Sequence, residues 1–167
     1  YIRENVFDNI VFYPENFSFV SEKSGYNHLY WYSIGGNLLK QVTAGQYEVQ
    51  EFLGYDPEEG SFYFSSNEES PMRSAIYKID RKGKKTRLSS QAGTNSAQFS
   101  ANMKYYMNRY SNLDTPTVIT LNDNTGKTLA TLMDNAALKQ EISGYDMPRK
   151  EFFTFQTSDG TTLNGWM

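Results

Sequence analysis

Apolar and polar residues alternate along most of the chain in short runs, which is the period of half-buried β-strands. The first clear run begins at Phe17, where Phe17 and Phe19 flank a serine, and a second aromatic run lies at 29–31. Polar segments that contain Gly, Asn, Asp or Pro separate the runs and are typical of turns. The pattern therefore predicts an all-β protein built from many short strands.

The runs form a unit that occurs nearly three times between Phe17 and Met133. Each unit has an aromatic strand, a second strand, a hairpin with a glycine and a short closing strand. The hairpin glycines are Gly36, Gly83 and Gly126, so the spacing is 47 and then 43 residues. A period in the forties with about four strands per unit is typical of propeller blades. We predict a partial β-propeller of about three four-stranded antiparallel blades.

The runs between the turns also give the strand positions. An apolar run at 10–13 precedes the first unit, and closing segments lie at 43–45 and 87–89. The other strands are expected at 49–55, 62–65, 75–79, 97–100, 105–110, 117–121 and 128–132. Blades bury their apolar faces only against neighbouring blades. Three blades are too few to close a ring, so we expect the chain to be part of a longer polypeptide.

The pattern changes after Met133. Asp134 or Asn135 can cap a short helix that runs through Ile142, because the alanines and leucine that follow favour helix. A strand at 151–157, a turn at 158–160 and a second strand at 163–167 then predict a hairpin of a different kind. We divide the chain into blades over 1–133, an exit segment over 134–150 and this hairpin over 151–167.

Composition and charge exclude several classes of function. The net charge of −3 gives no electrostatic footprint for nucleic acid, and the basic stretch 81–85 is interpreted as a solvated turn. The chain has no Cys and one His, so we expect no disulfide, no metal site and no cofactor. Asp123–Gly126 is interpreted as a hairpin turn rather than a calcium loop. No apolar run approaches the length that spans a bilayer.

No catalytic residue is expected within the chain. The Gly-x-Ser-x-Gly sequence of a hydrolase nucleophile does not occur, and an autonomous hydrolase conflicts with that absence. The one histidine, His28, lies at the start of a strand between aromatic residues and is interpreted as a structural or surface histidine. Two carboxylate pairs, Glu58-Glu59 and Glu68-Glu69, lie in turns and are interpreted as solvated.

Several segments resemble one enzyme family. They read SEKSGYNHLYWY, VTAGQYEV, YFSSNEESPMRSAIYKI, FSANMKYYMNRYS and DNAALKQEISGYDMPRKEFFTF, followed by SDGTTLNGWM. In this order they are similar to the last propeller blades and the exit segment of the dipeptidyl peptidase IV family of serine exopeptidases. The family opens its α/β-hydrolase domain with a hairpin of the form Asp-Gly-x-x-Leu-x-Gly-Trp. Here that pattern falls on Asp159, Gly160, Leu163, Gly165 and Trp166.

The resemblance implies a non-catalytic role for this chain in a larger enzyme. Family members remove N-terminal dipeptides with Pro or Ala in second position, using a Ser-His-Asp triad in the hydrolase domain. Their eight-bladed propeller limits substrate size and helps to anchor the substrate's N-terminus. By resemblance, this chain would hold the last blades and gate and scaffold substrate access, without the triad. Its partners would be the parent enzyme's peptide substrates, the remaining blades, the hydrolase domain and a second copy in a homodimer.

The resemblance assigns few individual residues. The family's glutamate pair for the substrate's amino terminus lies in an earlier blade, so that role falls on no residue here. A family loop that reaches toward the substrate pocket makes Arg3 and Glu4 the candidate substrate-binding residues, with a solvated chain end as the alternative. Bacterial family members are commonly periplasmic, so we expect a periplasmic or secreted protein.

A second hypothesis is a free-standing, propeller-like module that binds a protein or other ligand. Exposed aromatic residues would favour it, and the candidates are Tyr30, Trp31 and Tyr32. These three lie where blade strands pack, so a role in the core is at least equally consistent with the sequence. The two hypotheses differ in whether the reading frame continues into a sequence with Gly-x-Ser-x-Gly.

Overall fold

Three four-stranded antiparallel sheets, one helix and a two-stranded hairpin follow one another along the chain. The computed structural model describes residues 10–146 and 150–167. The first sheet contains β1 (Val11–Phe12), β2 (Asn16–Ser21), β3 (His28–Ser33) and β4 (Leu38–Gln41). The second contains β5 (Val49–Asp56), β6 (Ser61–Ser66), β7 (Ala75–Ile79) and β8 (Lys85–Arg87). The third contains β9 (Thr94–Phe99), β10 (Tyr105–Asn112), β11 (Thr115–Asp123) and β12 (Thr128–Met133).

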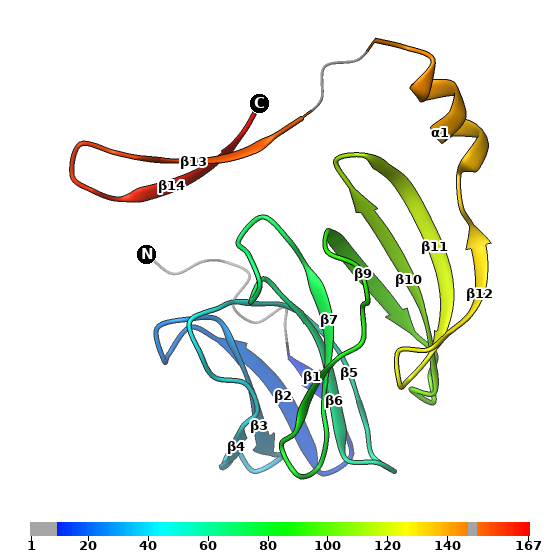
Figure 1. Ribbon diagram of the computed structural model, residues 1–167. Coiled ribbons are helices and arrows are strands. Elements are labelled where there is room, and N and C mark those ends of the chain that lie inside the picture. Colours follow the sequence, from blue (N-terminus) through cyan, green and yellow to red (C-terminus); the bar gives the residue numbers. More distant parts are fainter. Residues whose placement is uncertain (1–9, 147–149) are drawn as a thin grey trace.

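In each sheet the strands are hydrogen-bonded in chain order, so every blade is an antiparallel meander. The three sheets lie side by side, with the second between the first and the third (Figure 1). This arrangement confirms the predicted fold class, an all-β partial propeller of three blades with one short helix. No ring is closed by the described residues, since the first and third sheets each have a neighbour on one face.

An aromatic core joins the first sheet to the second. Trp31 from β3 packs against Phe62 from β6, with ring centroids 5.1 Å apart and the rings nearly perpendicular. Tyr55 lies 4.7 Å from both of these rings, so three aromatic side chains meet where the two sheets face each other. Aromatic pairs of this kind stabilise by about 0.5–1.5 kcal/mol beyond the apolar area they bury.

A second core joins the middle sheet to the third. Tyr63, Ile76 and Leu88 point from the second sheet toward Met103 and Tyr106 of the third. Because side chains alternate between faces along a strand, Phe62 and Phe64 of β6 serve the first core and Tyr63 serves the second. All six residues of β6 are buried, which makes it the most enclosed strand of the described structure.

The three hairpin glycines adopt the backbone conformation that the repeat predicts. Gly36, Gly83 and Gly126 have φ of 85°, 86° and 92°, the left-handed region that costs a side-chain-bearing residue about 1–2 kcal/mol. Their surroundings differ. A Cβ on Gly126 would lie 2.8 Å from the carbonyl oxygen of Leu88, whereas nothing lies within 4 Å of one on Gly83. Gly126 therefore also sets how closely the third sheet approaches the second.

The last strands of the first two sheets end earlier than the closing segments that the sequence indicates, and side-chain hydroxyls explain why. The last strands of the first two sheets end at residue 41 and residue 87, before or at the start of the predicted segments 43–45 and 87–89. Thr43 Oγ1 instead accepts a hydrogen bond from the backbone N–H of Leu29 at 2.9 Å. Ser89 Oγ accepts from the N–H of Ile76 in the same way at 3.0 Å. At both positions a hydroxyl replaces a ladder hydrogen bond between backbone groups.

The third sheet also begins earlier than predicted. Strand β9 starts at Thr94 rather than at Ala97, because the buried Asn95 anchors its first residues. The Asn95 amide donates to the carbonyl oxygens of Ser74 at 2.9 Å and Gln91 at 3.2 Å. The opening residues of the strand are thus held by the second sheet as well as by their own.

A short helix and a hairpin follow the third sheet, as the sequence predicts. Helix α1 spans Ala136–Ser143, and the hairpin pairs β13 (Phe152–Gln156) with β14 (Thr162–Trp166). Asp134 rather than Asn135 acts at the helix start, since its Oδ1 accepts the N–H of Ala136 at 3.0 Å. The Asn135 amide donates instead to the carbonyl oxygen of Thr117, which ties the helix to the third sheet.

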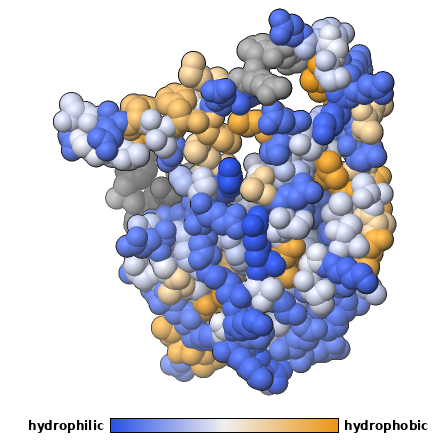
Figure 2. Space-filling model, viewed as in Figure 1, coloured by the Kyte–Doolittle hydropathy of each residue, from blue (hydrophilic) through white to orange (hydrophobic). Residues whose placement is uncertain are grey.

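Apolar side chains remain exposed on this hairpin. Phe152, Phe153, Phe155, Leu163 and Trp166 are between 39% and 66% exposed. Figure 2 shows an apolar region at the upper left of the molecule, where Figure 1 places β13 and β14. Two aromatic rings of β13, Phe153 and Phe155, lie with centroids 6.0 Å apart. A strand pair this apolar is typical of a surface that another part of a protein covers.

Two glycine substitutions test the hairpin and the contact between sheets separately. Gly83→Ala places an alanine in a left-handed backbone conformation without any clash, so it should lower the free energy of unfolding by about 1–2 kcal/mol. Gly126→Ala adds the clash with Leu88, which costs typically a further 1–3 kcal/mol. Urea unfolding followed by tyrosine and tryptophan fluorescence measures both. Equal losses in the two variants would contradict the close approach at Gly126.

Candidate functional site

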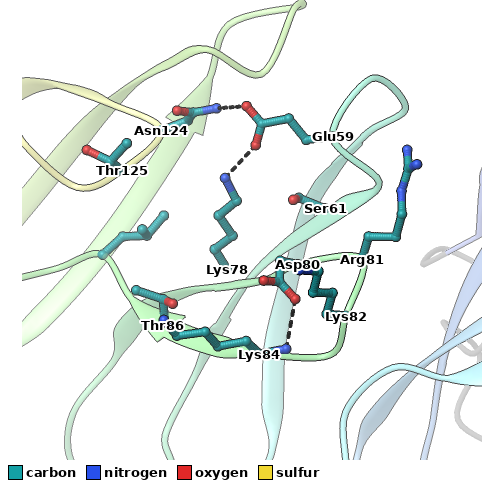
Figure 3. Close-up of a pocket in the computed structure, with 11 residues that line it drawn as sticks. Glu59, Ser61, Lys78, Asp80, Arg81, Lys82, Lys84, Thr86, Asn124 and Thr125 are labelled. Carbon is teal, nitrogen blue, oxygen red and sulfur yellow. Dashed lines mark hydrogen bonds and ion pairs between the residues drawn. The ribbon is translucent and has the colours of Figure 1, made fainter.

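A cleft of about 490 Å³ opens at one end of the contact between the second and third sheets. Its walls are the outer part of the second sheet and the hairpin that joins β11 to β12 (Figure 3). The cleft is lined mainly by charged and hydroxyl-bearing residues: Glu59, Ser61, Lys78, Asp80, Arg81, Lys82, Lys84, Thr86, Leu88, Asn124 and Thr125. The same face of the second sheet thus changes from apolar in the core to polar at its end.

Strand register places the cleft residues on one face. Tyr63 pairs with Lys78, and Lys78 pairs with Thr86, so these three side chains point the same way across β6, β7 and β8. Beyond β7, the turn closed by Gly83 carries the remaining cations. Asp80 Oδ1 accepts the backbone N–H of Lys84 at 2.8 Å and fixes the shape of this turn.

Glu59 is the centre of a charge network that spans the two sheets. Its carboxylate lies 2.6 Å from Lys78 Nζ in its own sheet. It also accepts the side-chain amide of Asn124, at 3.1 Å, from the hairpin of the third sheet, as Figure 3 shows. Lys104, at the start of β10, lies 3.3 Å from the same carboxylate and 2.9 Å from Asp56 Oδ2.

The network shifts the ionisation of its members. Hydrogen bonding from Lys78, more than any other contact, lowers the pKa of Glu59 to about 2. Hydrogen bonding to Asp56 raises the pKa of Lys104 above its ordinary value. Burial raises the pKa of the Tyr63 hydroxyl at the base of the cluster, although Lys78 beside it acts in the opposite direction. These shifts favour a charged Glu59 carboxylate, a charged Lys104 ammonium and a neutral Tyr63 hydroxyl at neutral pH.

Arg81, Lys82 and Lys84 differ from the other basic residues of this region. None of the three takes part in an ion pair with the described residues, and the guanidinium of Arg81 donates to the carbonyl oxygen of Glu58 at 3.2 Å. By contrast, Lys85 pairs with Glu68 at 2.5 Å and Arg87 with Glu69 at 2.8 Å. The cleft therefore has a positively charged rim that pairs with no carboxylate of the described part of the chain.

The carboxylate pairs lie in turns as expected, but they are less solvated than predicted. Glu59, Glu68 and Glu69 each pair with a cation on β7 or β8, because the turns between strands bring them alongside. Glu58 is the most exposed of the four, with 79% of its side chain accessible, and lies 3.2 Å from Lys104. Their contacts support a structural role that neutralises neighbouring cations.

His28 is structural, in agreement with the sequence. It is 1% exposed, and its Nε2 lies 3.0 Å from the carbonyl oxygen of Gly45, so Nε2 must carry the hydrogen of this bond. Its Nδ1 lies 3.1 Å from Thr43 Oγ1, and the ring of Tyr47 packs edge-on against it. Both ring nitrogens are thus used to hold the segment that follows β4.

The remaining candidates have different outcomes. Arg3 and Glu4 lie outside the described residues. Tyr30 and Trp31 are 1% and 7% exposed, so they belong to the interior, whereas Tyr32 is half-buried and its ring stacks on that of Phe17. Asp123 Oδ1 accepts the N–H groups of Thr125 and Lys127, which confirms the hairpin turn.

Within residues 10–146 and 150–167, no three or more His, Asp or Glu side chains are grouped as a metal ion would require. In the same part of the chain, no helix is long and apolar enough to cross a membrane.

The sequence did not reveal the cleft. The stretch 81–85 is visible in the sequence as a basic run. Which of its cations form ion pairs depends on residues far away along the chain. Lys104 and Asp56 are 48 residues apart, and Asn124 and Glu59 are 65 apart. No spacing rule relates such positions, so only the packing of the two sheets identifies them.

Comparison with known proteins identifies the family that this chain resembles in sequence and in structure. A family model described as the dipeptidyl peptidase IV (DPP IV) N-terminal region matches residues 2–117. The chain is similar to "Probable dipeptidyl peptidase 4" of Aspergillus flavus, with 31% identity over 87% of the chain and 19% of the relative. Dipeptidyl peptidase 4 of Trichophyton rubrum is 29% identical over the same shares. The crystal structure of Porphyromonas gingivalis dipeptidyl peptidase 4 superposes with a TM-score of 0.93 and 40% identity, over 97% of this chain and 23% of that one.

The ion pair of Lys104 should stabilise the contact between the second and third sheets. Lys104→Met leaves the carboxylate of Asp56, which is 1% exposed, without its cation, so we expect a lower thermal unfolding midpoint. Lys40→Met is the matched control, because Lys40 pairs with no described carboxylate. A midpoint unchanged by Lys104→Met would show that the pair contributes nothing to stability.

Glu59 should make stability depend on pH in the acid range. Its pKa is lowered from 4.5 to about 2 in the folded protein, so its contribution is complete above 4.5 and is lost as the pH falls toward 2. Because 37% of the side chain is exposed, solvent screening limits the size of this contribution. Urea midpoints of wild type and Glu59→Gln should differ at pH 7 and converge below pH 4.5. The exposed Glu51→Gln is the control, and a constant difference across this range would contradict the assignment.

Proposed function

The chain belongs to the dipeptidyl peptidase IV family, and we propose that it forms the non-catalytic propeller part of a serine exopeptidase. The observation that most supports this is the succession of three four-stranded blades, a short helix and an apolar hairpin in a single chain. The chain spans about a fifth of the length of the relatives it matches, 19% of the fungal proteins. The activity and substrates of the whole protein are therefore part of this proposal.

In this proposal the chemistry is supplied by a part of the protein other than these blades. The chain has no Gly-x-Ser-x-Gly sequence, and its one histidine is occupied by structural hydrogen bonds on both ring nitrogens. The catalytic serine, histidine and aspartate belong to a hydrolase domain that removes N-terminal dipeptides with Pro or Ala in second position. The blades restrict access of longer or folded substrates to that domain.

The scaffold role rests on rigidity and on exposed apolar surface. Two continuous cores fix the three blades relative to one another, so the chain can hold a neighbouring domain at a constant position. The hairpin formed by β13 and β14 carries the aromatic residues that such a domain would cover, among them Phe155 and Trp166. The outer strand β12 exposes Leu129, Leu132 and Met133, which a further blade would bury.

The test compares this chain with the longer protein that contains it. The longer protein should hydrolyse a Gly-Pro or Ala-Pro chromogenic amide, and the 167-residue chain alone should not, because it supplies no nucleophile. Release of the chromophore measures both. Hydrolysis by the chain alone would overturn the proposal, and no hydrolysis by either protein would favour the free-standing binding module.

A further inference from the structure

The basic residues of this chain are concentrated on one hairpin. Six of the 16 lysines and arginines lie between residues 78 and 87, although the chain carries a net charge of −3. Lys78, Lys85 and Arg87 are each paired with a glutamate of the neighbouring turns. The remaining three, Arg81, Lys82 and Lys84, all line the cleft between the second and third sheets.

The two carboxylates that line the cleft, those of Glu59 and Asp80, already accept hydrogen bonds from other residues of the chain. Glu59 is held by Lys78, Lys104 and Asn124. Asp80 accepts the backbone N–H of Lys84 and shapes the turn. The side chains of Lys82 and Lys84 form no hydrogen bond or ion pair with residues 10–146 or 150–167, so both ammonium groups can reach a ligand. The ring of Tyr63 lies beside the pair of Lys78 and Glu59, with Lys78 Nζ 5.5 Å from its centroid.

We propose that this cleft binds a small oxyanion carrying two or more negative charges, of the phosphate or dicarboxylate type. Lys82 and Lys84 would supply the charge, and the hydroxyl of Thr86 lines the same wall and offers a polar contact. Hydrogen bonds between ammonium groups and anionic oxygens are among the stronger ones in proteins. Lys78 and Glu59 form the back of the site as a neutral pair.

The size and charge of the cleft favour a small ligand over a polymer. Its volume of about 490 Å³ is within the range of sites that enclose small molecules. Three cations on one hairpin, without an ion-pair partner among residues 10–146 and 150–167, do not make the extended basic stripe that nucleic acids require. The binding would be independent of the exopeptidase chemistry, because the cleft residues are not those expected to bind the N-terminus of a substrate.

The experiment measures binding of inorganic phosphate and of succinate to the full-length protein by titration calorimetry. Lys82→Gln/Lys84→Gln should weaken binding at least about tenfold, since two charge-assisted hydrogen bonds are lost. Lys40→Gln/Lys139→Gln changes the net charge equally at positions outside the cleft and should leave the Kd within about twofold at 0.15 M salt, where distant charges are screened. Thermal midpoints of both double variants should match wild type, because these side chains form no hydrogen bond or ion pair with described residues.

Each result decides the proposal. Loss of binding in the cleft variant alone supports it, and the better of the two probes identifies the class of anion. Equal weakening in both double variants would mean that net charge rather than the cleft attracts the anion. No binding of either probe to the wild-type protein would also overturn the proposal.

Discussion

The structure depends on burial of the middle sheet on both of its faces. Strand β6 has no exposed residue, and its side chains alternate between the core shared with the first sheet and the core shared with the third. Neither outer sheet has this support, since each has a described neighbour on one side alone. Blades stabilise one another in sequence along the stack, so the middle blade is held most strongly and the outer faces need partners.

Where the second core ends, the contact between sheets changes from apolar to ionic. Tyr63, Lys78 and Thr86 share one face, so the row of side chains that packs Met103 and Tyr106 continues into the cleft. Lys104 and Asn124 cross from the third sheet to Asp56 and Glu59 and close the gap between the sheets. The same geometry that fixes the blades therefore leaves a polar hollow beside a hairpin rich in lysine.

The sequence predicted the blades well because their signals are local. Hairpin glycines need only their own turn to require positive φ, and aromatic alternation needs only a strand. The last strands of the first two sheets end earlier than the indicated closing segments because Thr43 and Ser89 replace backbone ladder bonds with hydroxyl contacts, which the period of apolar residues does not register. The start of β9 was missed for a similar reason, since Asn95 is anchored by carbonyl groups of the preceding sheet and its connection.

The sequence by itself determined the all-β class, the three repeated units, the short helix, the final hairpin and the resemblance to an enzyme family. Each of these depends on residues a few positions apart, whose side chains meet through strand and turn geometry alone. Only the tertiary structure decided which charges are paired. Glu59 meets Lys78 and Asn124 across two sheets, and Lys82 and Lys84 have no carboxylate partner among the described residues, because packing of distant strands rather than chain spacing sets these distances.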